Sequence, residues 1–81
     1  MILPTKHLPA DRSLIGIGGD VLALLDEPKT VSRLWDELRE MRKRRRKHAV
    51  NFDRFVLALD FLFTIDGVHL SRERIVKGAA L

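Results

Sequence analysis

The stretch that decides the fold is residues 51–70, which read NFDRFVLALDFLFTIDGVHL. Its first part predicts a helix, because apolar residues recur there at the spacing of one helical face. That face consists of Phe52, Phe55, Val56, Leu59, Leu62 and Phe63. Further apolar residues continue around the cylinder at Leu57, Ala58, Phe61 and Ile65. A helix that is apolar nearly all round is buried on more than one side, so we expect the rest of the chain to pack around this helix.

The second part of the same stretch predicts a β-hairpin. Asp66 and Gly67 form a turn signal, and residues 68–70 alternate in polarity like a strand. We expect a turn at residues 71–73, a second strand at residues 74–76 and a tail at residues 77–81.

Two more helices are predicted before this stretch. Ser13 is a suitable N-cap for the first, but its early glycines each cost roughly 1 kcal/mol in a helix, so we expect firm structure only over residues 18–25. Pro28 ends that helix, and Thr30 caps the second. The second helix has one apolar face, with Trp35 as an expected core anchor: Val31, Leu34, Trp35, Leu38 and Met41.

Three glycines in this first helix also resemble part of a phosphate-binding loop. The segment GIGG at residues 16–19 lacks the Gly-Lys-Ser/Thr ending that such a loop requires. We expect these glycines instead to allow close packing against another helix.

Three helices followed by a two-stranded hairpin predict a mostly α domain of the winged helix-turn-helix class, three helices plus a wing. We expect a single domain over residues 1–81, with an extended N-terminal segment at residues 1–11 and a basic connector at residues 42–49. The first three residues could add a strand to the hairpin. The alternative is a plain three-helix bundle with a loose tail.

One segment carries the basic character of the chain. It holds six of the fifteen basic residues, and outside it the acidic residues are in excess. Its members are candidates for contact with DNA phosphates: Arg42, Lys43, Arg44, Arg45, Arg46 and Lys47. The alternative is a solvated connector, helical or not, because a bare basic run is a weak motif.

The third helix lacks the side chains that read bases. A reading helix needs Arg, Lys, Asn, Gln or Ser directed at base edges, whereas this helix offers two carboxylates that would repel phosphates. Its surplus apolar side chains suggest an interface with a protein. The candidate partner-binding residues are Asp53, Arg54, Leu57, Asp60 and Phe61.

Enzymatic activity, cofactors and metal sites have little support in the sequence. His7, His48 and His69 are scattered and lack a metal-ligand partner at helical spacing. The chain has no cysteine, no apolar run of the ~18 residues that a membrane span needs, and no signal-peptide pattern at its start. We therefore expect a non-catalytic, cytoplasmic protein.

Four blocks of the sequence resemble the small middle components of bacterial ABC-three-component systems, and most of all the type called middle component six. These blocks are MILPTKHL at residues 1–8, DRSL at residues 11–14, TVSRLWDEL at residues 30–38 and FDRFVLALDFL at residues 52–62. The resemblance covers about nine tenths of the chain.

The resemblance implies a winged-helix adaptor that binds an SMC-like ABC ATPase and couples it to an effector, in defence against phages and plasmids. Such an adaptor could contact the DNA backbone without sequence specificity, and it could also form a homodimer. The alternative function is a winged-helix transcriptional regulator that binds a defined DNA sequence.

Overall fold

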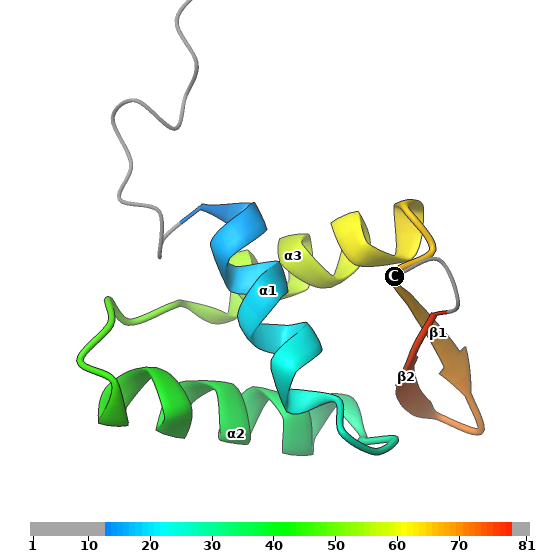
Figure 1. Cartoon of the computed structure of the whole chain (residues 1–81), viewed down its shortest axis with the longest axis horizontal. Helices are drawn as coiled ribbons and strands as arrows, with labels where there is room; N and C mark the ends of the chain where they lie inside the picture. The colour runs from blue at the N-terminus through cyan, green and yellow to red at the C-terminus, as the bar shows by residue number, and fades with distance from the viewer. Residues whose placement is uncertain (1–12, 79–81) are drawn as a thin grey trace, which may run out of the picture.

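The computed structural model describes residues 13–78, which form three helices followed by an antiparallel hairpin (Figure 1). The elements are α1 (Leu14–Leu24), α2 (Val31–Arg44), α3 (Phe52–Thr64), β1 (Val68–Ser71) and β2 (Arg74–Lys77). The mostly α architecture with a C-terminal hairpin is confirmed, and the alternative of three helices with a loose tail is wrong. The predicted extended segment at residues 1–11, including its possible strand, lies outside the described residues.

Each helix begins at a side-chain cap. The side-chain oxygens accept hydrogen bonds from backbone N–H groups three residues later: Ser13 from Gly16 at 2.9 Å, Thr30 from Arg33 at 3.2 Å and Asn51 from Arg54 at 2.8 Å. Such bonds satisfy donors that the first helical turn leaves without partners. The two caps predicted from the sequence are confirmed, and they fix where the helices start.

The expectation that α1 is firm only from Gly18 is wrong. The helix starts at Leu14, because the Ser13 cap and the packing of α1 on α3 outweigh the low helix propensity of glycine. Gly18 is buried against Leu62 of α3, as its predicted packing role requires. An added Cβ would nevertheless lie 3.5 Å from the Leu62 side chain, an ordinary contact distance, so packing alone does not demand a glycine there.

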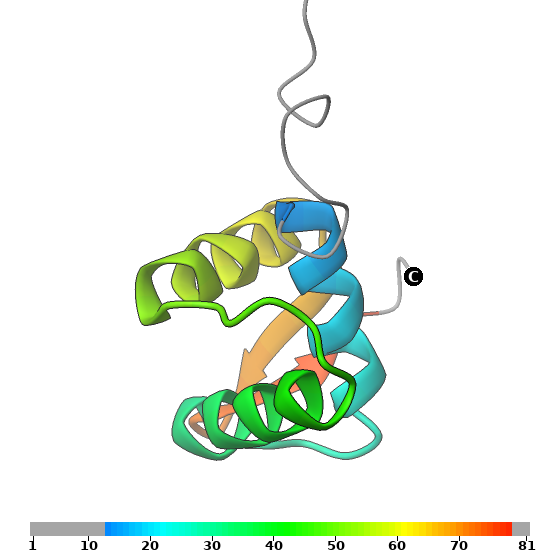
Figure 2. The ribbon, with the colours of Figure 1, turned by 90° about the vertical axis from the view of Figure 1, so that its left-hand side faces the viewer.

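The basic segment is partly helical. α2 continues through Arg44, so the predicted connector at residues 42–49 starts later, at Arg45. Cations suit this end of a helix because the backbone carbonyls carry partial negative charge there. The connector runs from the end of α2 to the start of α3 across one end of the molecule (Figure 2).

The core lies where the three helices meet, and α3 contributes Phe55, Ala58, Leu59 and Leu62 to it. An α-helix turns by about 100° per residue, so the mean direction of this buried face differs from that of the predicted face by about 50° around the helix axis. Phe52 and Phe63, which were expected inside, are 48% and 38% exposed. The small Ala58 faces the core instead, where α1 packs on α3.

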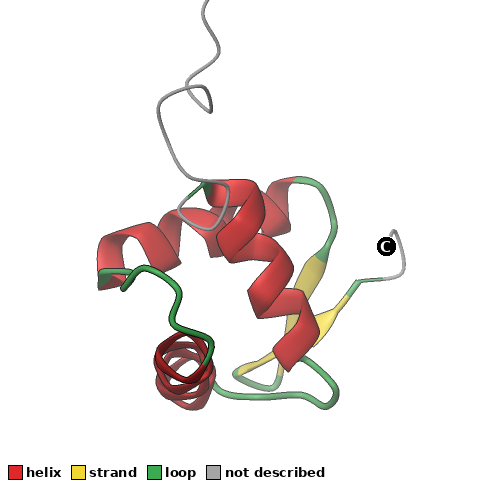
Figure 3. Ribbon diagram, turned by 60° about the vertical axis from the view of Figure 1, so that its left-hand side comes forward, coloured by secondary structure: helices red, strands yellow, loops and turns green. Residues whose placement is uncertain are grey.

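The hairpin is longer and its turn tighter than predicted. β1 and β2 pair from Val68↔Lys77 to Ser71↔Arg74, which leaves a two-residue turn at Arg72 and Glu73. These residues have φ angles of 52° and 66°, the left-handed values that two-residue hairpins of type I′ require. Figure 3 shows the hairpin at one end of the helical layer.

An additional backbone bridge ties the hairpin to the loop between α1 and α2. Lys29 donates its N–H to the carbonyl of Ile75 at 3.1 Å and accepts the N–H of Ile75 at 2.7 Å. Lys29 therefore occupies a third strand position beside β2. The sequence analysis did not predict it, since one residue after Pro28 shows no strand pattern.

Candidate functional site

The five candidate partner-binding residues share one side of α3, here called the α3 outer face. Asp53, Arg54 and Asp60 are exposed, Leu57 is 50% exposed, and Phe61 is half-buried against the core. They lie together because residues three and four positions apart on a helix are neighbours. Leu57 thus lies in the middle of the face, between carboxylates one turn to either side.

Further apolar side chains are exposed on α3 and just after it, outside the α3 outer face. Phe52, Phe63 and Ile65 are each more than a third exposed, although the sequence pattern placed the two phenylalanines inside. Four exposed large apolar residues on and just after one helix exceed the single, scattered ones that are normal on a protein surface. The surplus apolar character seen in the sequence is therefore on the outside of the molecule.

An aromatic cluster fixes the start of α3 against α2. Trp35 lies edge-on to Phe52 with ring centroids 5.4 Å apart, and 5.1 Å from the ring of Phe55. The guanidinium of Arg39 covers Trp35 at 5.1 Å. Such contacts add to the burial of apolar area. Trp35 packs against the core, which confirms its predicted role as an anchor.

The six cations proposed to contact phosphate divide into two groups. Arg42 is 1% exposed, and its guanidinium donates to the carboxylate of Asp20 at 2.5 Å and to the carbonyl of His48 at 3.0 Å. Lys47 donates to the same carboxylate at 2.8 Å. Asp20 therefore joins α1 to the end of α2 and to the connector. Burial leaves Arg42 without the exposed surface that phosphate contact requires.

Backbone geometry explains why Arg42 and Lys47 converge on Asp20. Arg46 has a φ of 54°, and the N–H groups of Arg46 and Lys47 donate to the carbonyls of Lys43 and Arg42 at 3.2 and 2.9 Å. This is a Schellman motif, which reverses the chain at a helix C-terminus and brings the residue after the left-handed position back to the last turn. Glycine usually occupies the left-handed position, and an arginine stands there in this chain, so this ending could not be predicted from residue type.

The other four cations of the segment point outward. Lys43, Arg44, Arg45 and Arg46 are exposed, and none of them has an acidic partner within residues 13–78. They occupy the last turn of α2 and the start of the connector. Here they are called the exposed basic turn. It is the part of the predicted phosphate-binding set that is accessible to a ligand.

A second buried cation, Lys29, stabilises the fold through ion pairs and a hydrogen bond. The Lys29 ammonium donates to the Glu37 carboxylate and to the Leu24 carbonyl, each at 2.5 Å, and pairs with Asp26 at 3.1 Å. The hydrogen bond from Lys29, with a second from Arg33, holds the pKa of Glu37 below its usual value. The bond to Glu37 raises the pKa of Lys29. Both groups are thus charged at neutral pH, and they link α2 to the loop before it.

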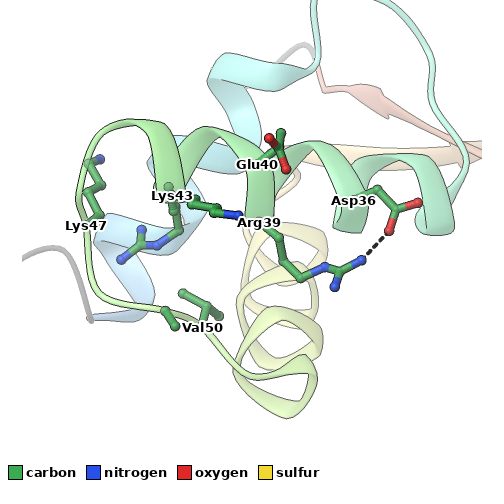
Figure 4. Close-up of a pocket in the computed structure, with 8 residues that line it drawn as sticks. Asp36, Arg39, Glu40, Lys43, Lys47 and Val50 are labelled. Carbon is green, nitrogen blue, oxygen red and sulfur yellow. Dashed lines mark hydrogen bonds and ion pairs between the residues drawn. The ribbon is translucent and has the colours of Figure 1, made fainter.

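A groove of about 690 Å³ lies between the C-terminal half of α2 and the connector (Figure 4). α2 contributes Arg39, Glu40 and Lys43 to it, and the connector contributes Lys47, Ala49 and Val50. An ion pair of 2.5 Å with Asp36 holds the Arg39 side chain at one end. The volume of the groove falls within the range of ligand-binding sites, about 300–1,000 Å³. Sequence reasoning missed this groove, because it depends on the chain reversal at Arg46.

The described residues contain no group of three or more His, Cys, Asp or Glu side chains arranged to hold a metal ion. His48 and His69 are exposed, and His7 lies outside residues 13–78. Within the same part of the chain, no helix has the length and apolar character to cross a membrane.

Comparison with known families decides the assignment. Residues 3–77 match the family described as ABC-three component (ABC-3C) system Middle Component 6. The chain belongs to this family. The resemblance found in the sequence is thereby confirmed over nearly the whole chain. No curated protein and no solved structure gives a significant match to the chain.

Membership gives the chain its biological setting. A middle component is one of the three parts of an ABC-3C defence system, so its partners are the other components. The α3 outer face, the exposed basic turn and the groove are therefore surfaces of a small helical subunit that works within an assembly.

Proposed function

We propose that this middle component is a non-catalytic winged-helix adaptor, which binds an SMC-like ABC ATPase and couples it to an effector in antiphage and antiplasmid defence. The single observation that carries this proposal is the exposure of large apolar side chains on α3, above all Leu57 at 50% exposure. A small domain that leaves such residues in water gains free energy when a partner covers them, at about 25 cal/mol per Å² of apolar area.

The order and packing of the elements support the winged-helix part of this proposal. α2, a connector, α3 and a hairpin follow one another as in that fold, and α3 leads directly into β1. The bridge between Lys29 and Ile75 adds a third strand position between α1 and α2. The hairpin would then be the wing.

The chemistry of the α3 outer face favours a protein partner over DNA bases. Asp53 and Asp60 would face phosphates, and Arg54 is the one cation on this face. A second copy of the chain is also a poor occupant, because two such faces bring carboxylates together, and like charges at an interface cost several kcal/mol. The complementary partner offers an apolar groove with cations along its rim, as in helix-in-groove recognition.

The exposed basic turn supports an accessory contact with the DNA backbone. Its four cations have no acidic partner in the described part of the chain, so they are free to replace counterions on phosphates. Phosphate contacts carry no sequence information. This contact fits an adaptor held near DNA by its ATPase better than it fits a sequence-reading regulator.

Co-expression with the ATPase and the effector of the same ABC-3C system tests the adaptor proposal. The tagged wild-type chain should retain the ATPase, and Leu57→Asp should lose it. Leu70→Asp is the matched control, because Leu70 is an apolar residue 62% exposed that lies on β1 and not on the α3 outer face. Circular dichroism should show that both variants fold.

Two outcomes would contradict the proposal. One is a chain recovered alone under conditions in which the ATPase is well expressed. The other is a chain that selects a defined duplex from a random pool, which would favour the transcriptional regulator.

A further inference from the structure

The groove between α2 and the connector is chemically different from the α3 outer face. On the α3 outer face carboxylates outnumber cations around an apolar centre, whereas in the groove four cations outnumber the carboxylates of Asp36 and Glu40. Ala49 is exposed on the connector side, and Val50 is half-buried beside it. Lys43 stands on the opposite wall, and the exposed basic turn continues from it (Figure 4). An occupant therefore meets an aliphatic floor and a positive rim.

The internal ion pairs determine which cations are available. Arg39 is held by Asp36, and Lys47 is drawn toward Asp20, although its side chain remains 28% exposed. Lys43 has no ion pair in the described residues and lies at the end of α2, next to more free cations. Carboxylates of a ligand can therefore pair with Lys43 without breaking an existing bond.

Two features disfavour nucleic acid as the occupant. The lining contains no aromatic side chain on which a base could stack, and single-stranded nucleic acids are commonly held by such stacking. It also contains the carboxylates of Asp36 and Glu40, which repel phosphates. A nucleic acid carries a phosphate at every step, whereas a peptide can place its acidic side chains beside Lys43 and the exposed basic turn and present backbone N–H groups to Asp36 and Glu40.

The chain's own N-terminal segment is also unsuitable. Residues 1–12 contain Lys6 and Arg12 against the single acidic Asp11. A basic segment gains nothing from a positive rim. The occupant that fits is a segment of another protein with the opposite charge.

We propose that this groove binds an acidic peptide segment with at least one apolar side chain, supplied by another protein. The apolar side chain would cover Ala49 and Val50, and the carboxylates would pair with Lys43 and its neighbours. This contact is independent of the α3 outer face. It gives the subunit a second partner site with the opposite charge preference.

Peptide selection tests this inference without knowledge of the partner. The full chain is immobilised, and short random peptides displayed on phage are selected on it. We expect enriched peptides to combine acidic and apolar residues. Synthetic copies should bind the wild-type chain, and Lys43→Glu or Ala49→Glu should weaken binding by about tenfold or more, since each 1.4 kcal/mol is a factor of ten.

Matched variants separate this site from other surfaces. Arg72→Glu makes the same kind of charge reversal at the tip of the hairpin and should leave peptide affinity nearly unchanged. Leu57→Asp should also leave it unchanged, so that failure of the α3 proposal and failure of this one are distinguishable.

Four results would overturn the inference: no enriched peptide, enriched peptides without acidic residues, equal losses in the Arg72→Glu variant, or displacement of the peptide by a single-stranded oligothymidylate that binds more tightly.

Discussion

We predict that Asp20→Ala is among the most damaging single substitutions outside the apolar core. It removes the carboxylate that neutralises Arg42, a guanidinium 1% exposed. Breaking a buried ion pair by removing one partner costs about 3–5 kcal/mol, because the remaining buried charge loses its counter-charge. A domain of 81 residues has a total free energy of unfolding of roughly 4–12 kcal/mol, so this loss is a large part of its stability.

Two further variants test the assigned cause. Asp20→Asn keeps an oxygen acceptor but removes the charge, and should cost less, about 1–3 kcal/mol. The double variant Asp20→Ala with Arg42→Met removes both buried charges and should recover to within about 1–2 kcal/mol of the wild type, as apolar replacements of buried pairs do. Lys47, which is partly exposed, can then turn to water.

Urea unfolding followed by circular dichroism gives the free energies for a double-mutant cycle. The control is Asp36→Ala, which removes the partner of Arg39 from an ion pair of the same 2.5 Å length but on the surface. It should cost no more than about 1 kcal/mol. The reasoning is refuted if Asp20→Ala costs as little as this control, or if the double variant is no more stable than Asp20→Ala.

Three more predictions follow from local geometry and charge. Arg46→Gly should raise the free energy of unfolding by about 0.5–1 kcal/mol in urea, because φ is 54° there and glycine accepts that value without strain; no gain would contradict the left-handed ending. Arg72→Asn with Glu73→Gly should raise the melting temperature by some degrees, since both turn positions have positive φ; a lower value would count against the type I′ turn. Lys29 lowers the pKa of Glu37, so the ionised carboxylate stabilises the fold above its ordinary pKa of 4.5, and this stabilisation is lost as pH falls through the lower, folded-state pKa. In a Glu37→Gln variant the free energy of unfolding should therefore fall less steeply at acid pH. An unchanged pH dependence would argue against the pair.

Local signals were enough to predict most of the secondary structure. The caps at Ser13 and Thr30 act within one helical turn, and the turn at Asp66 follows directly from the end of α3. Such interactions involve residues close in sequence, so periodicity and residue type reveal them. The order of three helices and a hairpin could therefore be predicted with no knowledge of the tertiary contacts.

Interactions between distant segments could not be predicted in this way. The face of α3 that is buried depends on the side against which α1 packs. Because α1 packs on the side of Ala58, Phe52 and Phe63 remain partly exposed to water. Nothing in the basic run distinguishes Arg42 from Lys43, because the difference is made by Asp20, 22 residues earlier than Arg42. The five partner-binding candidates lie on one side of α3 because helical spacing alone brings them together, and their role in binding stays a prediction.

The division of the basic run determines how its proposed role must be tested. Replacing all six cations from Arg42 to Lys47 by serine would orphan Asp20 and unfold the domain, so any loss of DNA binding would have two causes. Replacing only Lys43, Arg44, Arg45 and Arg46 leaves that buried network intact and lowers the net charge from +4 to zero. If these four contact phosphates, the salt dependence of DNA affinity for the complex should become shallower by up to about 3.6 in log–log slope, equally for all sequences. An unchanged slope in a folded variant would show that the exposed basic turn is not a DNA contact and would leave the neighbouring groove as the reason for its charge.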